Sequence, residues 1–399
     1  MPADAPPHAA TVPERPGPAR RGAWTLHALA VGFYATSWAA AALLAYGAAQ
    51  FLGPWRAGLG RVPGWAVAAW CALNALFLVL GLFGRPKRRA AGRALRREEA
   101  PALFDLIDAT AARVGVGAVS ELRLKPAPVM AAARVLRPGR FVVSERRALV
   151  VGVPLLRALS VDEFRAAVAH ELAHLAAGDV QRGRIVGAAA RRIAVMRTVL
   201  ARPPLPAALF LRWANPVWWY VRAYGALLAR GAARIRRVQE SHADALAAEA
   251  AGATCYAATL LEVAATELAF RRLAPGIVVR SVERGAAPAN FFADLAAAHA
   301  ALGPDARRRL AREVLDVHDE DATGHPPLRL RLAALGVHPA VREAPPTRAA
   351  AELVPALERI EGELTPLALR GLALGMADEI RRRRARRDTA AAAAAAEAR

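Results

Sequence analysis

The segment His170-Glu171-Leu172-Ala173-His174 has the residue types and the spacing of a metal site with its own general base. In a helix, residues four apart lie on one face, so His170 and His174 can share one tetrahedral zinc ion. Glu171 then lies beside the metal, where a carboxylate can take a proton from an attacking water. The spacing therefore predicts a hydrolytic zinc site, which other parts of the chain must position.

The stretch from Ser160 to Leu175 predicts the helix that carries these residues. Its apolar residues recur at helical spacing, at Phe164, Ala167, Val168, Leu172 and Leu175. Ser160 is a suitable N-cap, and Glu163 three residues later completes a capping-box pattern.

A catalytic zinc ion needs a third protein ligand, and the best candidate is Glu240 in the sequence Glu-Ser-His-Ala-Asp. Residues 234–251 are rich in alanine and predict a helix, which places Glu240 and Asp244 on one face. Asp244 can then accept a hydrogen bond from a ligand histidine and fix its tautomer. Taken alone, the same pattern also fits a solvated helix face.

A third segment, residues 323–331, reads TGHPPLRLR. Its two prolines end any preceding helix and fit the first turn of the next, so His325 lies at a rigid junction. A hydrogen-bond donor there can stabilise the oxyanion of a tetrahedral intermediate. The segment also fits a simple helix start with Arg331 in solvent.

In combination, the three segments resemble the integral-membrane zinc endopeptidases that include the HtpX-type stress proteases and the CAAX prenyl endopeptidases. That family has His-Glu-x-x-His, a downstream Glu-x-x-x-Asp, and a later His-Pro segment with an arginine six residues after the histidine. The chain matches all three over roughly residues 100–340. It departs from the HtpX type in an interrupted region at 184–230 and in its Arg- and Ala-rich tails.

The resemblance implies a fold and a set of site residues. The fold is mainly α with a small β-sheet (α+β), a gluzincin-like peptidase domain behind an N-terminal transmembrane helical hairpin. One zinc ion is expected per chain. The implied residues are the zinc ligands His170, His174 and Glu240, the general base Glu171, the supporting carboxylates Asp244 and Asp179, and the catalytic or substrate-contacting residues His325 and Arg331.

Two uncharged stretches, residues 24–52 and 64–84, are each long enough to cross the roughly 30 Å hydrocarbon core as a helix. A cleavable signal peptide is disfavoured, because the first apolar run is too long and a second one follows. A buried hairpin in a soluble protein is the alternative. Basic residues flank the pair, whereas the intervening loop carries only Arg56 and Arg61. The positive-inside rule predicts a multi-pass protein of the cell inner (cytoplasmic) membrane with the catalytic domain facing the cytoplasm.

The net charge of +21 does not indicate a nucleic-acid partner. All but two of the 55 basic residues are arginine, the charge is spread along the chain, and aromatic residues are not interleaved with it as a stacking surface requires. The two cysteines, Cys71 and Cys255, exclude a disulfide framework or a cysteine zinc cluster.

Other segments predict further elements. Residues 99–120 predict an amphipathic helix, and residues 121–126 and 140–151 predict extended segments. The second of these precedes the zinc helix and could offer its edge to an extended peptide. Residues 184–230 predict a helical hairpin that is either interfacial or packed against protein, with true membrane spans as the alternative.

We therefore expect five regions: a disordered tail (1–22), a transmembrane hairpin (23–84), a zinc metallopeptidase domain (85–343), a C-terminal helical segment (344–380) and a low-complexity Arg/Ala tail (381–399). The expected function is zinc-dependent hydrolysis of protein or peptide substrates at the lipid bilayer, in membrane-protein quality control or regulated proteolysis. The alternative is a non-catalytic membrane scaffold or chaperone with a structural zinc. Oligomeric state is left open.

Overall fold

The computed structural model describes residues 17–52, 63–83, 92–138, 143–176, 179–201, 215–317, 325–342, 344 and 346–377. Contacts divide the chain into two compact units, both discontinuous in sequence. The first unit comprises mainly residues 90–179 and 239–399, and the second comprises 12–89 and 180–238. The Arg/Ala tail at 381–399 and most of the loop at 53–63 lie outside the described residues.

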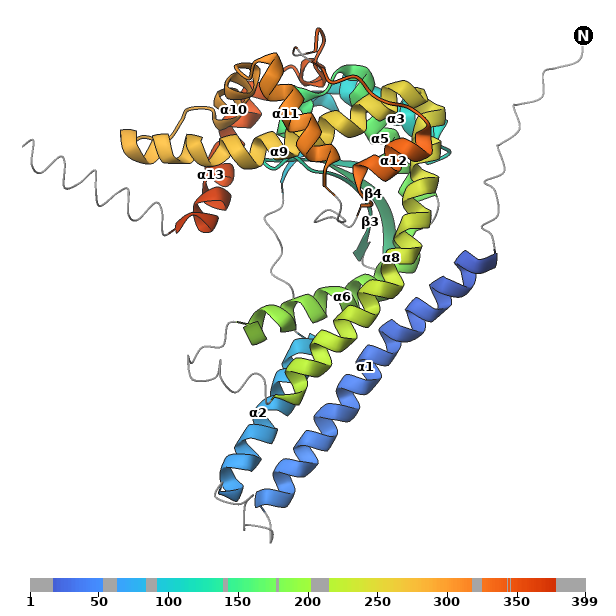
Figure 1. Cartoon of the computed structure of the whole chain (residues 1–399), viewed down its shortest axis with the longest axis vertical. Helices are drawn as coiled ribbons and strands as arrows, with labels where there is room; N and C mark the ends of the chain where they lie inside the picture. The colour runs from blue at the N-terminus through green and yellow to red at the C-terminus, as the bar shows by residue number, and fades with distance from the viewer. Residues whose placement is uncertain are drawn as a thin grey trace, which may run out of the picture. The chain divides into compact units, whose positions relative to one another are not determined.

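The second unit is built from long helices: α1 (Gly17–Leu52), α2 (Gly64–Phe83), α6 (Asp179–Ala201) and the N-terminal part of α8 (Pro216–Ala251) (Figure 1). Two stretches, Trp24–Phe51 and Gly64–Phe83, are long and apolar enough to cross a membrane. The first helix begins at Gly17, inside the predicted tail. Alanine and arginine are good helix formers, so the helix extends beyond its apolar stretch.

All four helices contribute side chains to one apolar core. Phe33 of α1 and Leu78 of α2 are fully buried, and Met196 of α6 and Val221 of α8 pack in the same cluster. The hydroxyl of Tyr220 adds polar contacts, at 2.8 Å from the hydroxyls of both Thr36 and Ser37 in α1. Helices α6 and α8 are therefore packed against protein, and neither is among the two candidate spans found in the described residues.

The first unit contains a four-stranded sheet in the order β1-β2-β4-β3. Its strands are β1 (Arg93–Leu95), β2 (Glu121–Lys125), β3 (Met130–Pro138) and β4 (Val143–Gly152). Strands β2 and β4 are parallel, and the other pairs are antiparallel. The sequence predicts β2 and β4 but misses β3, because its start, Met-Ala-Ala-Ala, lacks the β-branched residues typical of strands.

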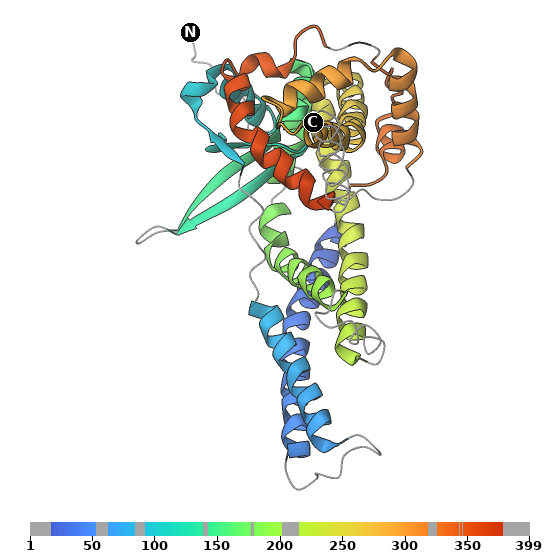
Figure 2. The ribbon, with the colours of Figure 1, turned by 90° about the vertical axis from the view of Figure 1, so that its left-hand side faces the viewer.

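Strand β3 forms an edge of this sheet. Residues 148–151 of β4 pair with β2 on one side and with β3 on the other. The sequence predicts that residues 140–151 offer the free edge of the sheet. This prediction is wrong, because the edge strand next to β4 is β3. Beyond the short β2, the two strands continue as a ribbon that extends away from the helices of this unit (Figure 2).

Helices make up the rest of the first unit. They are α3 (Pro101–Arg113), α4 (Val153–Ala158), α5 (Val161–Ala176), α9 (Ala253–Arg284), α10 (Phe291–Ala300), α11 (Pro304–Leu315), α12 (Leu328–Leu335) and α13 (Leu357–Gly375), with short 3₁₀ turns η1 (Arg97–Glu99) and η3 (Ala350–Leu353). Helix α3 ends at Arg113 rather than near residue 120, because Gly115 adopts a positive φ of 71° that stops the helix. The long α9 packs against α5, α10 and α11 (Figure 1). The prediction of a mainly helical fold with a small sheet is confirmed.

Helix α13 is joined to the rest of the first unit by a fully buried carboxylate. Glu361 accepts two hydrogen bonds from Arg157 of α4, at 2.5 and 2.6 Å, and one from Asn290 at 2.7 Å. The apolar residues predicted for this helix, including Leu357 and Ile360, are buried. The C-terminal helix therefore belongs to the same packed body as α4 and α10.

Candidate metal centre

Helix α5 positions the two histidines, and the predicted capping box fixes where it begins. The backbone N–H of Ser160 donates to Glu163 at 2.8 Å, and the N–H of Glu163 donates to the Ser160 hydroxyl at 3.2 Å. The predicted apolar face is buried, with Phe164 and Leu172 fully enclosed. This packing fixes the rotation of the helix, and therefore the direction of its histidine-bearing face.

Glu240 of α8 lies between the two histidines of α5. His170 Nε2 is 3.6 Å from Glu240 Oε2, and His174 Nε2 is 3.6 Å from Glu240 Oε1. The imidazole rings of His170 and His174 are 4.9 Å apart between centroids. Segments some seventy residues apart in sequence thus bring together the three side chains predicted as zinc ligands.

The residues present fit a zinc ion. His170 Nε2 and Glu240 Oε2 are buried atoms without a hydrogen-bond partner among the described residues. Two ligand atoms about 2.0–2.1 Å from a tetrahedral ion stand about 3.3 Å apart, close to the observed 3.6 Å. Buried polar atoms normally have partners, so two that face each other across this distance indicate a shared cation.

His325 is the fourth group at this site. Its Nδ1 lies 2.6 Å from Glu240 Oε2, and one possible cation-binding group in the described residues is His170, Glu240 and His325, whose ligand atoms lie within 4.8 Å of one another. A separation of 2.6 Å is shorter than the about 3.3 Å expected between two ligands of one tetrahedral ion. His174 Nε2, at 3.6 Å from Glu240 Oε1, has a separation close to that expected for two ligands of one ion.

The protonation states favour metal binding. Burial, together with the neighbouring His170, lowers the pKa of His174 to about 4, so its imidazole is neutral at pH 7. Burial alone would raise the pKa of Glu240, but the close contact with His325 and its charge outweigh this effect and hold that pKa below its usual value. A neutral imidazole and an ionised carboxylate are the forms that bind zinc.

Behind His170 lies a hydrogen-bonded network of Asp244, Tyr256 and Arg331. The Tyr256 hydroxyl is 2.8 Å from His170 Nδ1 and donates to Asp244 at 2.5 Å. Arg331 donates two hydrogen bonds to Asp244, at 2.9 and 2.6 Å, and one to the Tyr256 hydroxyl at 2.9 Å. Burial opposes ionisation of Asp244, but the Arg331 hydrogen bond prevails and keeps the pKa of this carboxyl low.

This network determines which nitrogen of His170 faces the metal side. Because the Tyr256 hydroxyl gives its proton to Asp244, it can accept one from His170 Nδ1. Asp244 Oδ1, 3.1 Å from the same nitrogen, is a second acceptor. The Nδ1–H tautomer leaves the Nε2 lone pair free to bind a cation.

Tyr256, at the start of α9, is the residue that the sequence analysis missed. Its ring is fully buried and stacks on His170, with centroids 5.9 Å apart. No local pattern marks it, because it is separated by 86 positions from the histidine that it contacts. Only the chemistry of a buried tyrosine, whose hydroxyl needs polar partners, could have suggested a role.

Glu171 points toward the edge strand. Its Oε2 accepts a hydrogen bond from the backbone N–H of Ala132 in β3, at 3.2 Å. Burial raises the pKa of the Glu171 carboxyl, against the lowering effect of the nearby His170 and His325. A carboxylate with a raised pKa beside a candidate metal centre is suited to accept and return a proton.

The remaining predicted site residues have different positions. Arg331, in α12, is bound to Asp244 rather than exposed to solvent. Asp179 is the first residue of α6, and its side chain lies outside the described part of the structure. Residues 323–324, before His325, are also outside it.

A zinc metallopeptidase is the class of enzyme that this fold and site define. Residues 141–337 match the model of peptidase family M48. The chain therefore carries an M48 peptidase domain, as the resemblance of its three motifs predicts. Comparisons with curated proteins and with solved structures gave no match.

Proposed function

We propose that this chain is a membrane-anchored zinc-dependent endopeptidase. His170, His174 and Glu240 bind the ion, and Glu171 is the general base. The observation that carries this proposal is the pair of buried atoms, His170 Nε2 and Glu240 Oε2, that face each other at 3.6 Å without hydrogen bonds, next to Glu171.

When bound, zinc supplies a Lewis acid that polarises the scissile carbonyl and acidifies a water molecule. Glu171 takes the proton of the attacking water and returns it to the leaving amine. Its raised pKa favours holding that proton between the two steps. His325, whose partly exposed side chain lies just before α12, donates a hydrogen bond to the developing oxyanion.

Arg331 has a positioning role in this scheme. Its side chain is only 11% exposed, and its guanidinium is occupied by Asp244 and Tyr256. It therefore acts through Asp244 on the orientation of His170, and direct contact with substrate is not required of it.

The substrate peptide adds to the outer edge of β3. The N–H of Ala132 points away from β4, toward Glu171. In an antiparallel pair, the side to which the backbone N–H and C=O groups point alternates from one residue to the next. Met130 and Arg134 therefore present these groups on the same side as Ala132. An extended peptide paired there would lie alongside Glu171, as in other complexes that extend a sheet.

We also propose that the apolar helices α1 and α2 form a two-span anchor in the inner membrane and that the catalytic domain faces the cytoplasm; the apolar length of the two helices supports the membrane association. Damaged membrane proteins or a dedicated regulatory protein are the proposed substrates. Reporter fusions within residues 53–62 and after residue 377 test the topology. A cytoplasmic location for the loop reporter would overturn it.

Cleavage of casein by the detergent-purified chain, beside Glu171→Gln at equal zinc content, tests the proposed chemistry. We expect the variant to keep its zinc and to lose at least about a hundredfold in rate. Equal cleavage by both proteins would refute the general-base role. Zinc binding without cleavage of casein or of membrane-protein substrates would instead support the scaffold alternative.

A further inference from the structure

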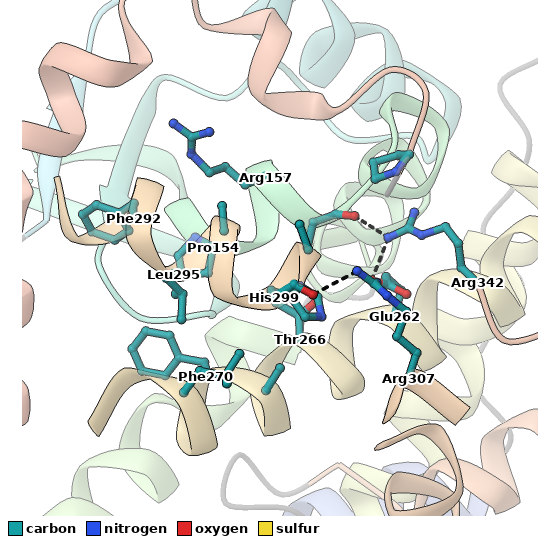
Figure 3. Close-up of a pocket in the computed structure, with 16 residues that line it drawn as sticks. Pro154, Arg157, Glu262, Thr266, Phe270, Phe292, Leu295, His299, Arg307 and Arg342 are labelled. Atoms are coloured by element: carbon teal, nitrogen blue, oxygen red, sulfur yellow. Dashed lines mark hydrogen bonds and ion pairs between the residues drawn. The ribbon is translucent and has the colours of Figure 1, made fainter. Parts of the chain in front are cut away.

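A cavity of about 170 Å³ lies in the first unit, between α4, α9 and α10. Its apolar part is formed by side chains from these helices, among them Phe270, Phe292 and Leu295, which gather on one side in Figure 3. None of the proposed metal-site residues lines this cavity, so it is distinct from the metal centre.

The other end of the cavity is polar. There Thr266, His299 and Arg307 lie together with Arg342 (Figure 3). Thr266 is 4% exposed, and its hydroxyl has no hydrogen-bond partner among the described residues. A buried hydroxyl without a partner is costly, and a ligand atom beside it would remove that cost.

Arg307 brings a buried positive charge to the same end. It is 7% exposed, and its guanidinium donates to the backbone carbonyls of Leu302, at 3.2 Å, and His299, at 3.0 Å. No carboxylate of the described residues forms an ion pair with it. A buried guanidinium that meets only carbonyl groups favours an anionic partner.

The other charges around the cavity are already paired. Arg342 binds Glu262 at 2.7 Å, and Arg157 is held by Glu361 outside the cavity. Glu262 is the only carboxylate among the lining residues, and burial raises its pKa. Arg307 interacts with Glu262 only at longer range and forms no ion pair among the described residues, so its guanidinium can still take an anionic partner.

The state of His299 agrees with this distribution. Burial, followed by the charges of Arg307 and Arg342, lowers the pKa of His299 to about 4. The same positive potential that disfavours a charged imidazole favours an incoming anion.

We propose that this cavity binds a monocarboxylate that carries a compact apolar group. The carboxylate contacts Arg307 and Thr266, and the apolar group occupies the space between Phe270, Phe292 and Leu295. Because an engineered protein cavity of about 150 Å³ holds benzene, an aryl group or a short acyl chain has the right size. The carboxylate can come from a free fatty acid or from the C-terminal apolar residue of a peptide.

Isothermal titration of 3-phenylpropanoate into the full chain, held in phosphatidylcholine nanodiscs, tests the proposal. We expect a dissociation constant on the order of 0.1 mM. Arg307→Met should weaken binding at least tenfold, and Ala296→Leu, which fills the cavity without touching its polar end, should do the same. Arg308→Met, one position along α11 and paired with Asp305 outside the cavity, is the matched control and should change nothing.

Three results would overturn the proposal: no heat of binding, binding that survives Ala296→Leu, or equally tight binding of the neutral 3-phenylpropanol. If Arg307→Met fails to fold, Ala296→Leu still decides the outcome. Parallel titrations of hexanoate and N-acetyl-phenylalanine distinguish an acyl ligand from a peptide C-terminus. Because no turnover is measured, failure here leaves the peptidase proposal untouched.

Discussion

Two arginine clusters support α5, one behind its histidines and one at its first turn. In the Asp244 cluster, Arg331 binds Asp244 and Tyr256, which contact His170. In the Glu163 cluster, defined as Arg342, Glu163 and Glu262, Arg342 binds both carboxylates at 2.7 Å.

The two clusters use the same chemistry for different purposes. In the first, Asp244 is held by Arg331 and contacts the candidate zinc ligand His170, so the charges decide which nitrogen of His170 is free. In the second, Arg342 binds the carboxylate that caps α5, so the charges decide where the helix begins. Similar arginine–carboxylate pairs can therefore control chemistry in one place and stability in the other.

The largest effect is expected from Arg331→Met, because the change leaves the Asp244 carboxylate buried without its cation. The free energy of unfolding should fall by about 3–5 kcal/mol, and zinc affinity should fall at least about tenfold. Denaturant titration measures the free energy of unfolding, and zinc competition measures the zinc affinity. Arg331→Lys, which keeps the charge but loses the two-pronged contact, should restore part of both.

Arg342→Met should act on stability alone. The 22% exposure of this arginine side chain reduces the expected loss to about 2–3 kcal/mol. Zinc affinity and casein cleavage should stay within about twofold of the parent, measured well below the unfolding transition. A selective loss of zinc binding would show that the two clusters are not separate in function.

His299, beside the Glu163 cluster, gives a pH test. Its pKa is about 4 in the folded chain and near 6.5 when unfolded, so the unfolded state binds more protons between these values. Stability should be complete above about pH 6.5 and fall by about 3 kcal/mol as the pH drops to 4. His299→Gln should flatten this part of the stability curve. An unchanged slope would place the titrating group elsewhere.

Tyr256→Phe should have the smallest effect and the most selective one. The ring still stacks on His170, but the hydroxyl between His170 and Asp244 is lost. We expect zinc affinity to fall about tenfold with little change in unfolding free energy. Tyr224→Phe is the control, since that hydroxyl bonds Leu29 in the second unit. Equal zinc affinity in both variants would remove Tyr256 from the metal centre.

The sequence predicts those parts of the site that depend on neighbouring residues. Histidine spacing, the capping box at Ser160 and the shared face of Glu240 and Asp244 all follow from helix geometry, and so does the apolar face of α5. Hydropathy likewise predicts α1 and α2, because length and composition alone decide them.

The other parts of the fold and of the site could not be predicted in this way. Tyr256, Arg342 and the edge position of β3 depend on contacts between distant segments, which no local pattern contains. Arg331 shows both what the sequence can predict and what it cannot. Its place in the motif marks it as part of the site, but only the structure shows that it binds Asp244 instead of facing solvent.

Because the first unit is formed from separate stretches of the chain, its site residues are also synthesised in a fixed order. The chain emerges from the ribosome with His170 first, then α6 and the N-terminal part of α8, then Glu240, and Arg331 last. At about 5–20 residues per second, roughly ten to thirty seconds separate the first histidine from the arginine. The proposed metal centre therefore stays incomplete until the helices of the second unit have been made.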